Sequence, residues 1–514
     1  MTPIKSTRHL VTALALTAAL TAAGRSETRA TTTSVTFSPD TVTVLRNPLQ
    51  GWVMYLGRTW DENFWDEKGY DRMKADSTGL TVRVSDYASC AYIRTSWASF
   101  EPEEGRYAWD DPDSRLMKLV RSVNERGLRI AFRIVIDGRD QGQNTPQYVF
   151  DAGADGYYDP NAPGKNRSPY PDDPVFQQKY ARFLHAFARQ FDDPDKVEFI
   201  DAYSLGKWGE SHSMIYKDNS NKEKVFDWAI ALATDCFKRV PMLLHYHRML
   251  GDPDDDGWGS VPADAEKLIN RAIDKGFSLR HDAFGMHGYY QDWEKDMARK
   301  WNFRRPIIME GGWITGAHHR YWRDPSGLYR EGHAEDVRKG EYDASAEARV
   351  NMMDFRINDE TRSWFEDAFP LVKSFVAHGG YRLYPATVTA PSAAQRGDRV
   401  TVSTLWRNLG WGYCPTNIPQ WNQKYKVGIA LLDSASRPVR IVTESRSDLS
   451  TWLRETPAGY HTSVSLAGLP AGTYTWAVAL IDTTRDSSPA LRMAVDPELI
   501  TPQGWLPAGK ITIL

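Results

Sequence analysis

The chain has 514 residues, a formal net charge of -3 and an aromatic content of 12%. This length exceeds what one ordinary hydrophobic core holds, so two or more domains are expected. The nearly balanced charge and the lack of a run of basic residues argue against nucleic acid or a membrane surface as a partner. The three cysteines are far apart in the sequence, and their spacing fits neither a zinc site nor a disulfide framework.

The first thirty residues have the pattern of a secretory signal. Lys5 and Arg8 precede an apolar run over residues 10–23, which is too short to span a bilayer. Cleavage is expected after Gly24 or Ala30, and no later stretch is long and apolar enough for a membrane helix. We therefore expect residues 1–30 to be a signal peptide and the mature protein to be secreted or periplasmic.

Between residues 31 and 380, short apolar segments alternate with amphipathic ones, and helix stops such as Gly127 lie between them. The expected strands are 52–55, 92–94, 129–136, the segment that starts at 200, 242–247, 283–290, 307–309 and 349–356. The expected helices are 115–126, 176–191, 224–237, 263–275 and 364–377. Eight strands interleaved with helices predict an α/β fold, a (β/α)8 TIM barrel.

The sequence changes character after about residue 380. Segments with β-branched or alternating residues are separated by Gly, Pro, Asn and Asp, which predicts short strands. These expected strands are 400–406, 426–432, 439–443, 462–466 and 473–481. Residues 381–514 are therefore expected to form a C-terminal β-sandwich. It carries no obvious catalytic constellation; it is expected to pack on the barrel, and carbohydrate binding is the alternative.

Two glutamates follow predicted barrel strands in similar surroundings. Glu210 comes after Gly-Lys-Trp208-Gly, and Glu310 begins Glu-Gly-Gly-Trp313 directly after a four-residue apolar segment. Glycine permits a tight turn, and tryptophan offers a flat apolar face to a sugar ring. Barrel enzymes carry their chemistry at the C-terminal ends of the strands, and two facing carboxylates are the equipment for cleaving a glycosidic bond. The simpler alternative is that each glutamate is an ordinary solvated loop residue.

Further candidate residues fall at the same strand ends. The expected substrate-binding residues are Trp52, Arg94, Trp97, Arg133, Trp208, His245, His287, Tyr289 and Trp313. The arginines could instead close internal salt bridges, and the histidines could be core residues. A zinc site built from the histidines is also possible, but no HExxH or comparable spacing supports one. Neither a metal nor a cofactor is expected.

The segment 97–109 resembles the W-x-x-x-E-P-x-x-G-x-Y-x-W stretch after strand two in β-galactosidase-type members of the clan A glycoside hydrolases. The resemblance extends over about residues 45–380. It implies a barrel with retaining chemistry, Glu210 as the acid/base at the end of strand four, and Glu310 as the nucleophile at the end of strand seven. The W-G-E-x-H pattern of residues 208–212 is also similar to that of poorly characterised secreted bacterial proteins of this type.

One position departs from the pattern of that clan. Its members usually carry Asn immediately before the acid/base Glu, where it binds the sugar 2-hydroxyl, and this chain has Gly209. Other positions fit: Arg94 resembles the arginine that keeps the nucleophile ionised, and Tyr289 or Tyr290 resembles a tyrosine near it on strand six. Because of Gly209, either another side chain supplies the sugar contact or the site is altered.

These observations lead to two hypotheses. The first is a secreted glycoside hydrolase that cleaves β-glycosidic bonds of an oligosaccharide or polysaccharide with retention. Its carboxyl groups are expected about 5–5.5 Å apart, with Glu310 ionised and the pKa of Glu210 raised by burial and by the charge of Glu310. An endo-acting polysaccharidase is an alternative within the enzyme class, and the long loops 137–173 and 313–340 favour exo action on short chains instead. The second is a secreted carbohydrate-binding protein on a barrel scaffold, which Gly209 supports.

Overall fold

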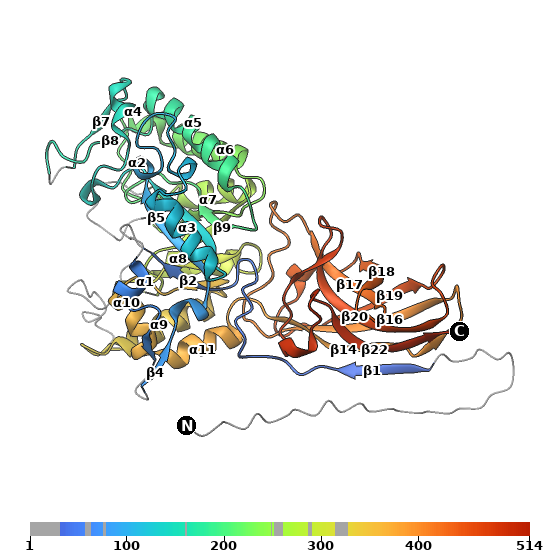
Figure 1. Cartoon of the computed structure of the whole chain (residues 1–514). Coiled ribbons are helices and arrows are strands. Elements are labelled where there is room, and N and C mark those ends of the chain that lie inside the picture. Colours follow the sequence, from blue (N-terminus) through green and yellow to red (C-terminus); the bar gives the residue numbers. More distant parts are fainter. Residues whose placement is uncertain are drawn as a thin grey trace. The chain divides into compact units, whose positions relative to one another are not determined.

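The computed structural model describes residues 31–56, 63–75, 79–159, 162–247, 249–250, 261–285, 290–313 and 327–514. These residues form two compact units (Figure 1). The barrel unit comprises Val44–Tyr381 and Trp411–Asn422. The sheet unit comprises the described part of Met1–Thr43 together with Arg382–Gly410 and Gln423–Leu514. Among the described residues, no helix has the length and apolar character needed to cross a membrane.

The barrel unit contains a closed barrel of parallel strands, as the sequence predicts. In barrel order the strands are β2 (Gly51–Tyr55), β5 (Ala88–Ser96), β6 (Arg129–Val135), β9 (Val197–Asp201), β10 (Met242–His245), β11 (Phe277–His281), β12 (Ile307–Met309) and β13 (Met352–Asp354). The register of β13 on β2 closes the ring, so the sheet has no free edge. The carboxyl ends of all eight strands therefore meet at one mouth.

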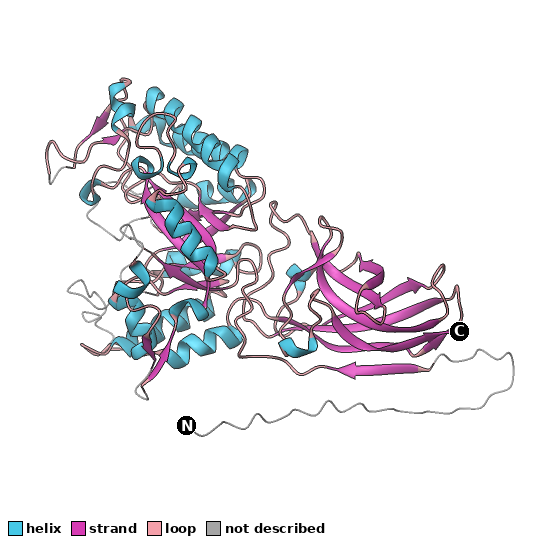
Figure 2. Ribbon diagram, in the orientation of Figure 1, coloured by secondary structure: helices cyan, strands magenta, loops and turns pink. Residues whose placement is uncertain are grey.

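Helices follow the strands and cover them on the outside (Figure 2). They are α2 (Trp97–Phe100), α3 (Arg115–Glu125), α5 (Pro174–Phe191), α6 (Lys222–Cys236), α7 (Ala265–Asp274), α8 (Asp292–Trp301), α9 (Ala334–Glu347), α10 (Asp359–Glu366) and α11 (Phe369–His378), with the short α1 (Phe64–Glu67) and α4 (Gln147–Asp151) in loops. Two hairpins, β3–β4 (Met73–Ala75, Leu80–Val82) and β7–β8 (Gly156–Tyr157, Ser168–Pro169), also lie in loops. Local signals explain the boundaries: for example, Asp173 caps α5 by accepting hydrogen bonds from the amides of Val175 and Phe176.

Side chains alternate along each barrel strand between the helices and the interior. On β6, the ring of Phe132 lies 5.3 Å from that of Phe187 on α5, whereas its neighbour Arg133 reaches carboxylates inside the barrel. On β11, Arg280 likewise faces the interior, and His281 faces Tyr246 and the helical shell. The period of two thus sends charged residues inward from strands that otherwise look apolar.

Two boundaries within the barrel unit differ from those that the sequence suggests. Strand six was expected at residues 283–290, and the strand lies at Phe277–His281, immediately after the end of α7. The polar Arg280 and His281 hide it, because they interrupt the apolar run. The helix expected at 364–377 is two helices, and Pro370 in the first turn of α11 marks the new start.

The sheet unit contains two sheets, which are mainly antiparallel. The first has the order β1 (Thr32–Thr36), β14 (Leu383–Pro391), β16 (Arg399–Asn408), β19 (Ala458–Ser465). The second has the order β15 (Ala393–Ala394), β22 (Leu506–Ile513), β20 (Gly472–Asp482), β17 (Tyr425–Leu432), β18 (Pro438–Glu444), and β21 (Ser488–Leu491) also pairs with β20. Residues such as Leu432, Ile481 and Trp505 pack in one buried cluster. All five strands expected after residue 380 are present.

The division between the units differs from the expected boundary at residue 380. Residues 31–43 were expected with the barrel, but β1 pairs with β14, from Thr32 opposite Pro391 onward, and so lies in the sheet unit. Trp411–Asn422 lies in the barrel unit instead, where the indole of Trp411 donates to the carbonyl of Val350 at 2.9 Å. Pairing between distant parts of a chain leaves no signal in local periodicity.

Replacing Trp52 with Ala should destabilise the barrel unit strongly. Trp52 is fully buried, its ring stacks on Phe355 at 4.2 Å, and its indole donates to the carbonyl of Val372 at 3.2 Å. The cavity should lower the free energy of unfolding by about 3–5 kcal/mol, measured by denaturant titration of the full chain. Val42→Ala, at an 82% exposed residue, is the control. A loss for W52A as small as that of the control would contradict this packing.

Candidate active site

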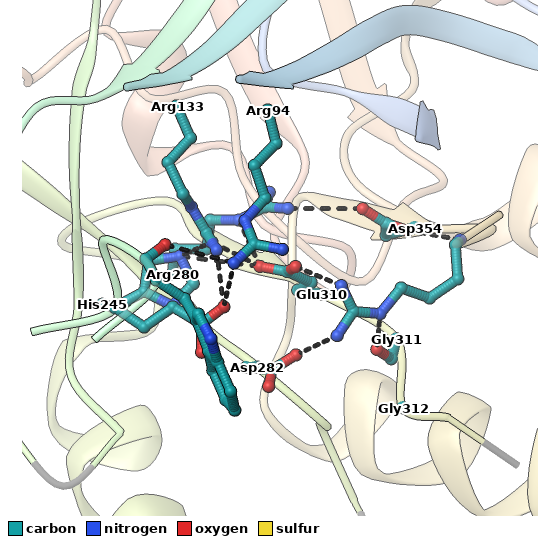
Figure 3. Close-up of polar contacts among 12 residues, drawn as sticks. Arg94, Arg133, His245, Arg280, Asp282, Glu310, Gly311, Gly312 and Asp354 are labelled. Carbon is teal, nitrogen blue, oxygen red and sulfur yellow. Dashed lines mark hydrogen bonds and ion pairs between the residues drawn. The ribbon is translucent and has the colours of Figure 1, made fainter. Parts of the chain in front are cut away.

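The buried guanidinium of Arg133 organises a cluster of charged side chains at the mouth of the barrel (Figure 3). Its Nη1 donates to Glu210 Oε1 at 2.7 Å, its Nη2 to Glu310 Oε2 at 2.6 Å, and its Nε to Asp201 Oδ2 at 2.9 Å. Nη2 also contacts His245. The two glutamates expected to be catalytic therefore share one guanidinium, even though they follow strands β9 and β12, three strands apart in the barrel.

Glu310 is surrounded by positive charge. Besides Arg133, Arg280 donates from Nε to Oε2 at 3.2 Å, and Arg356 donates from Nη1 to Oε1. The nearest nitrogen of His245 is 3.6 Å from Oε2. Burial alone would raise the pKa of Glu310, but the guanidinium groups of Arg133, Arg356 and Arg280 outweigh it and hold the pKa well below its usual range. Glu310 is thus ionised at neutral pH, as a nucleophile requires.

Glu210 is also ionised, and the expectation of a raised pKa is wrong. Burial and the charge of Glu310 do act in that direction. Arg133 and the close approach of His212, whose Nε2 lies 3.5 Å from Oε2, outweigh them and lower the pKa of Glu210 to about 2. Arg94 adds to this effect from 4.0 Å. The resting site therefore holds two carboxylate anions.

The loop that carries Glu210 requires glycine at position 209. Gly209 has φ +74°, and a Cβ built there would lie 3.2 Å from Cδ of Arg133. Trp208 beside it has φ +61°, and its amide donates to the carbonyl of Asp137 at 2.7 Å. Asn tolerates a left-handed backbone, but here its side chain would press on Arg133. Close packing of the loop on Arg133 accounts for the glycine at position 209.

Two arginines that are not among the predicted site residues make the contact with Glu310 that was expected of Arg94. Arg94 pairs with Glu210 and donates to the carbonyl of Trp208 at 3.4 Å. Arg280 on β11 and Arg356 after β13 contact Glu310 instead. Arg280 lies outside the strand expected at residues 283–290. Placing the strand at Phe277–His281 shows by alternation that Arg280 points into the barrel.

Asp282 differs from the other carboxyl groups of the cluster. It follows β11 and pairs through Oδ1 with Arg356 Nη2 at 2.5 Å, and its side chain is 12% exposed, whereas that of Glu310 is fully buried. Burial, together with the charges of Glu210 and Glu310, raises the pKa of Asp282 to about 8 against the opposing effect of Arg356. At neutral pH, Asp282 therefore holds a proton among ionised neighbours. Its distinct ionisation marks a candidate acid.

Two of the expected aromatic residues lie at this site. The guanidinium carbon of Arg356 is 4.9 Å from the ring centre of Trp313, which is 47% exposed. Trp208 precedes Gly209, and its ring lies 4.2 Å from the ammonium of Lys207. An exposed indole held beside the charged cluster offers a flat face to a sugar ring.

Trp52 and Trp97 were expected at the substrate site, and the structure places both elsewhere. Trp52 packs outward against α10 and α11. The indole of Trp97 donates to Glu101 Oε2 at 3.0 Å, and its ring packs against Tyr180 and Phe183 of α5. Both residues are core packing in the helical shell. The remaining candidates, His287 and Tyr289, lie outside the described residues.

No protein-family model and no curated protein matches this chain. Solved structures with similarity to it include the catalytic domain of β-amylase from Paenibacillus polymyxa, with 11% identity, a TM-score of 0.42, and coverage of 64% of this chain and 99% of that one. An endo-β-1,4-mannanase from Thermotoga petrophila has 9% identity, a TM-score of 0.37, and coverage of 93% and 98%. Endo-glycoceramidase II from Rhodococcus sp. has 14% identity, a TM-score of 0.35, and coverage of 82% and 97%. Similarity at this level leaves reaction and substrate to be inferred from the chain's own site.

Replacing Arg133 with Met should destabilise the protein in a pH-dependent way. Removing one partner of a buried ion pair costs about 3–5 kcal/mol, because the carboxylates stay buried without compensation. The lowered pKa of Glu210, about 2, means that its ionic contribution is present above the unfolded-state pKa and is lost as pH falls. The difference in unfolding free energy between R133M and wild type should therefore shrink between about pH 6 and pH 2.

Denaturant titrations across this pH range test the prediction. Arg271→Met is the matched control, since Arg271 pairs on the surface with Glu223 and Asp227, which are each 50% exposed. It should change stability little at any pH. A cost for R133M that does not depend on pH would contradict the coupling of Arg133 to the carboxylates.

Proposed function

We propose that this chain is a glycoside hydrolase that cleaves β-glycosidic bonds with retention, using Glu310 as nucleophile and Glu210 as acid/base. The observation that carries the proposal is that both carboxylates bind the same buried guanidinium of Arg133 at the barrel mouth. Two carboxylates held so close can act on opposite sides of one bond. We expect their separation in the working enzyme to be about 5–5.5 Å, as retention requires.

In the first step, Glu310 attacks the anomeric carbon, the bond to the leaving oxygen breaks, and that oxygen takes a proton. In the second step, water attacks the glycosyl–enzyme bond, gives a proton to the acid/base group, and releases Glu310. Arg280 and Arg356 keep Glu310 anionic and return it to that state after each cycle. Because Glu310 is fully buried in the described structure, substrate binding has to displace one of these contacts before attack.

Asp282 supplies the proton in this proposal. The resting Glu210 is ionised, whereas Asp282 keeps its proton at neutral pH. Coupled carboxyl groups titrate as one system, so the proton held by Asp282 passes to Glu210, which delivers it to the leaving oxygen and returns it to Asp282 after the second step.

The substrate we propose is an oligosaccharide or polysaccharide outside the cytoplasm. The exposed face of Trp313 beside Arg356 supports a sugar ring at the entrance. The signal pattern of residues 1–30 supports secretion or transfer to the periplasm. Exo action on β-galactoside-like substrates is the finer form of the proposal, and it rests on the length of the loops 137–173 and 313–340 and on the resemblance of residues 97–109.

Separate substitutions of the two glutamates test the catalytic pair. Glu310→Ala should abolish turnover of aryl β-glycosides, since no glycosyl–enzyme bond can form. Glu210→Ala should preserve the first step for substrates with very good leaving groups, because these need little protonation. Added azide should then restore turnover and give a β-glycosyl azide, identified by NMR. An azide product of α configuration would indicate an inverting enzyme and refute retention.

The competing function is a carbohydrate-binding protein that has lost catalysis. A panel of aryl β-glycosides and oligosaccharides separates the two, with hydrolysis and binding measured on the same preparation. If the wild-type chain binds a sugar but hydrolyses nothing above the rate of E310A, the binding function replaces the hydrolase.

The pH dependence of kcat/KM tests the role of Asp282. Since its protonated form is required and its pKa is about 8, activity on substrates with poor leaving groups should fall as pH rises through about 8. Asp282→Asn should remove this limb and lower the rate by about 10²- to 10⁴-fold. Substrates with very good leaving groups should be affected much less. Asp235→Asn, at a side chain that is 69% exposed, is the control; an unchanged limb in D282N would exclude Asp282.

A further inference from the structure

Three side chains that commonly bind metals meet beside the proposed active site. They are His247, His281 and Glu294, and all three are buried. One ligand atom from each lies within 4.8 Å of the other two. Nδ1 of His247 is 3.8 Å from Oε1 of Glu294, and the rings of His247 and His281 are 4.9 Å apart. Within the described residues, this is the group of histidines and carboxylates that is compact enough to share one ion.

The fold holds each of the three in place. His281 ends β11, and its carbonyl accepts a hydrogen bond from the amide of Glu310 at 2.9 Å. His247 lies two residues beyond the end of β10. Glu294 lies in the first turn of α8, where its Oε2 accepts from the amide of Gln291 at 3.0 Å. This bond fixes the carboxylate, and its other oxygen, Oε1, points to His247. The three side chains thus come from three separate elements and meet at one point.

The chemistry of this set fits zinc. Two imidazoles and one carboxylate form a known ligand set for Zn²⁺, with a fourth position open. With bonds of about 2.0–2.2 Å, tetrahedral ligands lie roughly 3.3–3.6 Å apart. The 3.8 Å between His247 and Glu294 is already close to this, and movements of about 1 Å complete the set. We propose that His247, His281 and Glu294 bind one zinc ion.

The side chain of His212 would lie between the ion and Glu210. The ring of His212 is 6.0 Å from that of His247, and its Nε2 is 3.5 Å from Oε2 of Glu210. Zinc on His247 would hold this face of His212 in place and thereby fix the contact that orients Glu210. The metal has a positioning role, and its binding does not depend on the proposed hydrolase activity.

Metal analysis of the full chain tests the proposal. Because the ligands are buried, zinc is expected to enter during folding and to leave slowly, so the protein is expressed in zinc-supplemented medium and dialysed against zinc-free buffer. Mass spectrometry of the unfolded protein should find about one zinc per chain. Cobalt(II) incorporated in the same way should give the visible absorption of a tetrahedral complex.

Variants locate the ion. His247→Ala and His281→Ala should retain only background zinc. Glu294→Gln still accepts the bond from Gln291, so it should fold normally and lose at least the roughly 10- to 100-fold in zinc affinity that even outer-shell partners contribute. His461→Ala is the control, since His461 is an exposed residue of β19 that bonds to Ser403 in the sheet unit.

Thermal unfolding gives a readout that is independent of activity and of the hydrolase proposal. Zinc should raise the melting temperature of the wild-type chain and of H461A, and should leave that of E294Q nearly unchanged. If the wild-type chain retains no more zinc than H281A, no site exists. If E294Q and H281A both retain as much zinc as wild type, the ion binds elsewhere and the assignment is wrong.

Discussion

The ion pairs of Arg133 are the interaction on which the barrel mouth depends. A guanidinium without solvent contact is very unfavourable unless anions surround it, and Asp201, Glu210 and Glu310 supply them. The same contacts keep both glutamates ionised and hold the side chain of Arg133 inside the barrel. The Gly209 loop packs against that side chain. Stability and chemistry therefore share one group, and a change that weakens one weakens the other.

The architecture of the barrel could be predicted because helix and strand periods are local properties. Glu210 and Glu310 could be found because each follows a short apolar strand and has glycine beside it. The inward arginines were harder to find. Arg280 interrupts an apolar run, so the local pattern around it does not indicate a strand. The sequence therefore predicts strand six at residues 283–290, several residues after its actual position. Arg356 shows no pattern at all until the position of β13 is known.

The errors on Trp52 and the ionisation of Glu210 have different physical causes. Trp52 lies three residues before Tyr55, whose ring faces Arg356 from 5.2 Å, so the alternation of a strand sends Trp52 the other way. That information was present in the sequence. The pKa of Glu210, in contrast, is set by Arg133, which is 77 positions away along the chain. Only the closed barrel brings these residues together, and no local pattern reports on their distance.

The pairing of β1 with β14 has a consequence for how the chain matures. Strand β1 leaves a ribosome or a translocation channel some 355 positions before its partner does, as the contact between Ser34 and Thr389 shows. Until then its backbone hydrogen-bonding groups remain open to other chains. A (β/α)8 barrel can assemble in the interval, because its neighbouring strands are close in sequence. The sheet unit is thus the last part of the molecule to be completed, and a chain that stalls before residue 391 exposes an unpaired strand to aggregation and to proteases.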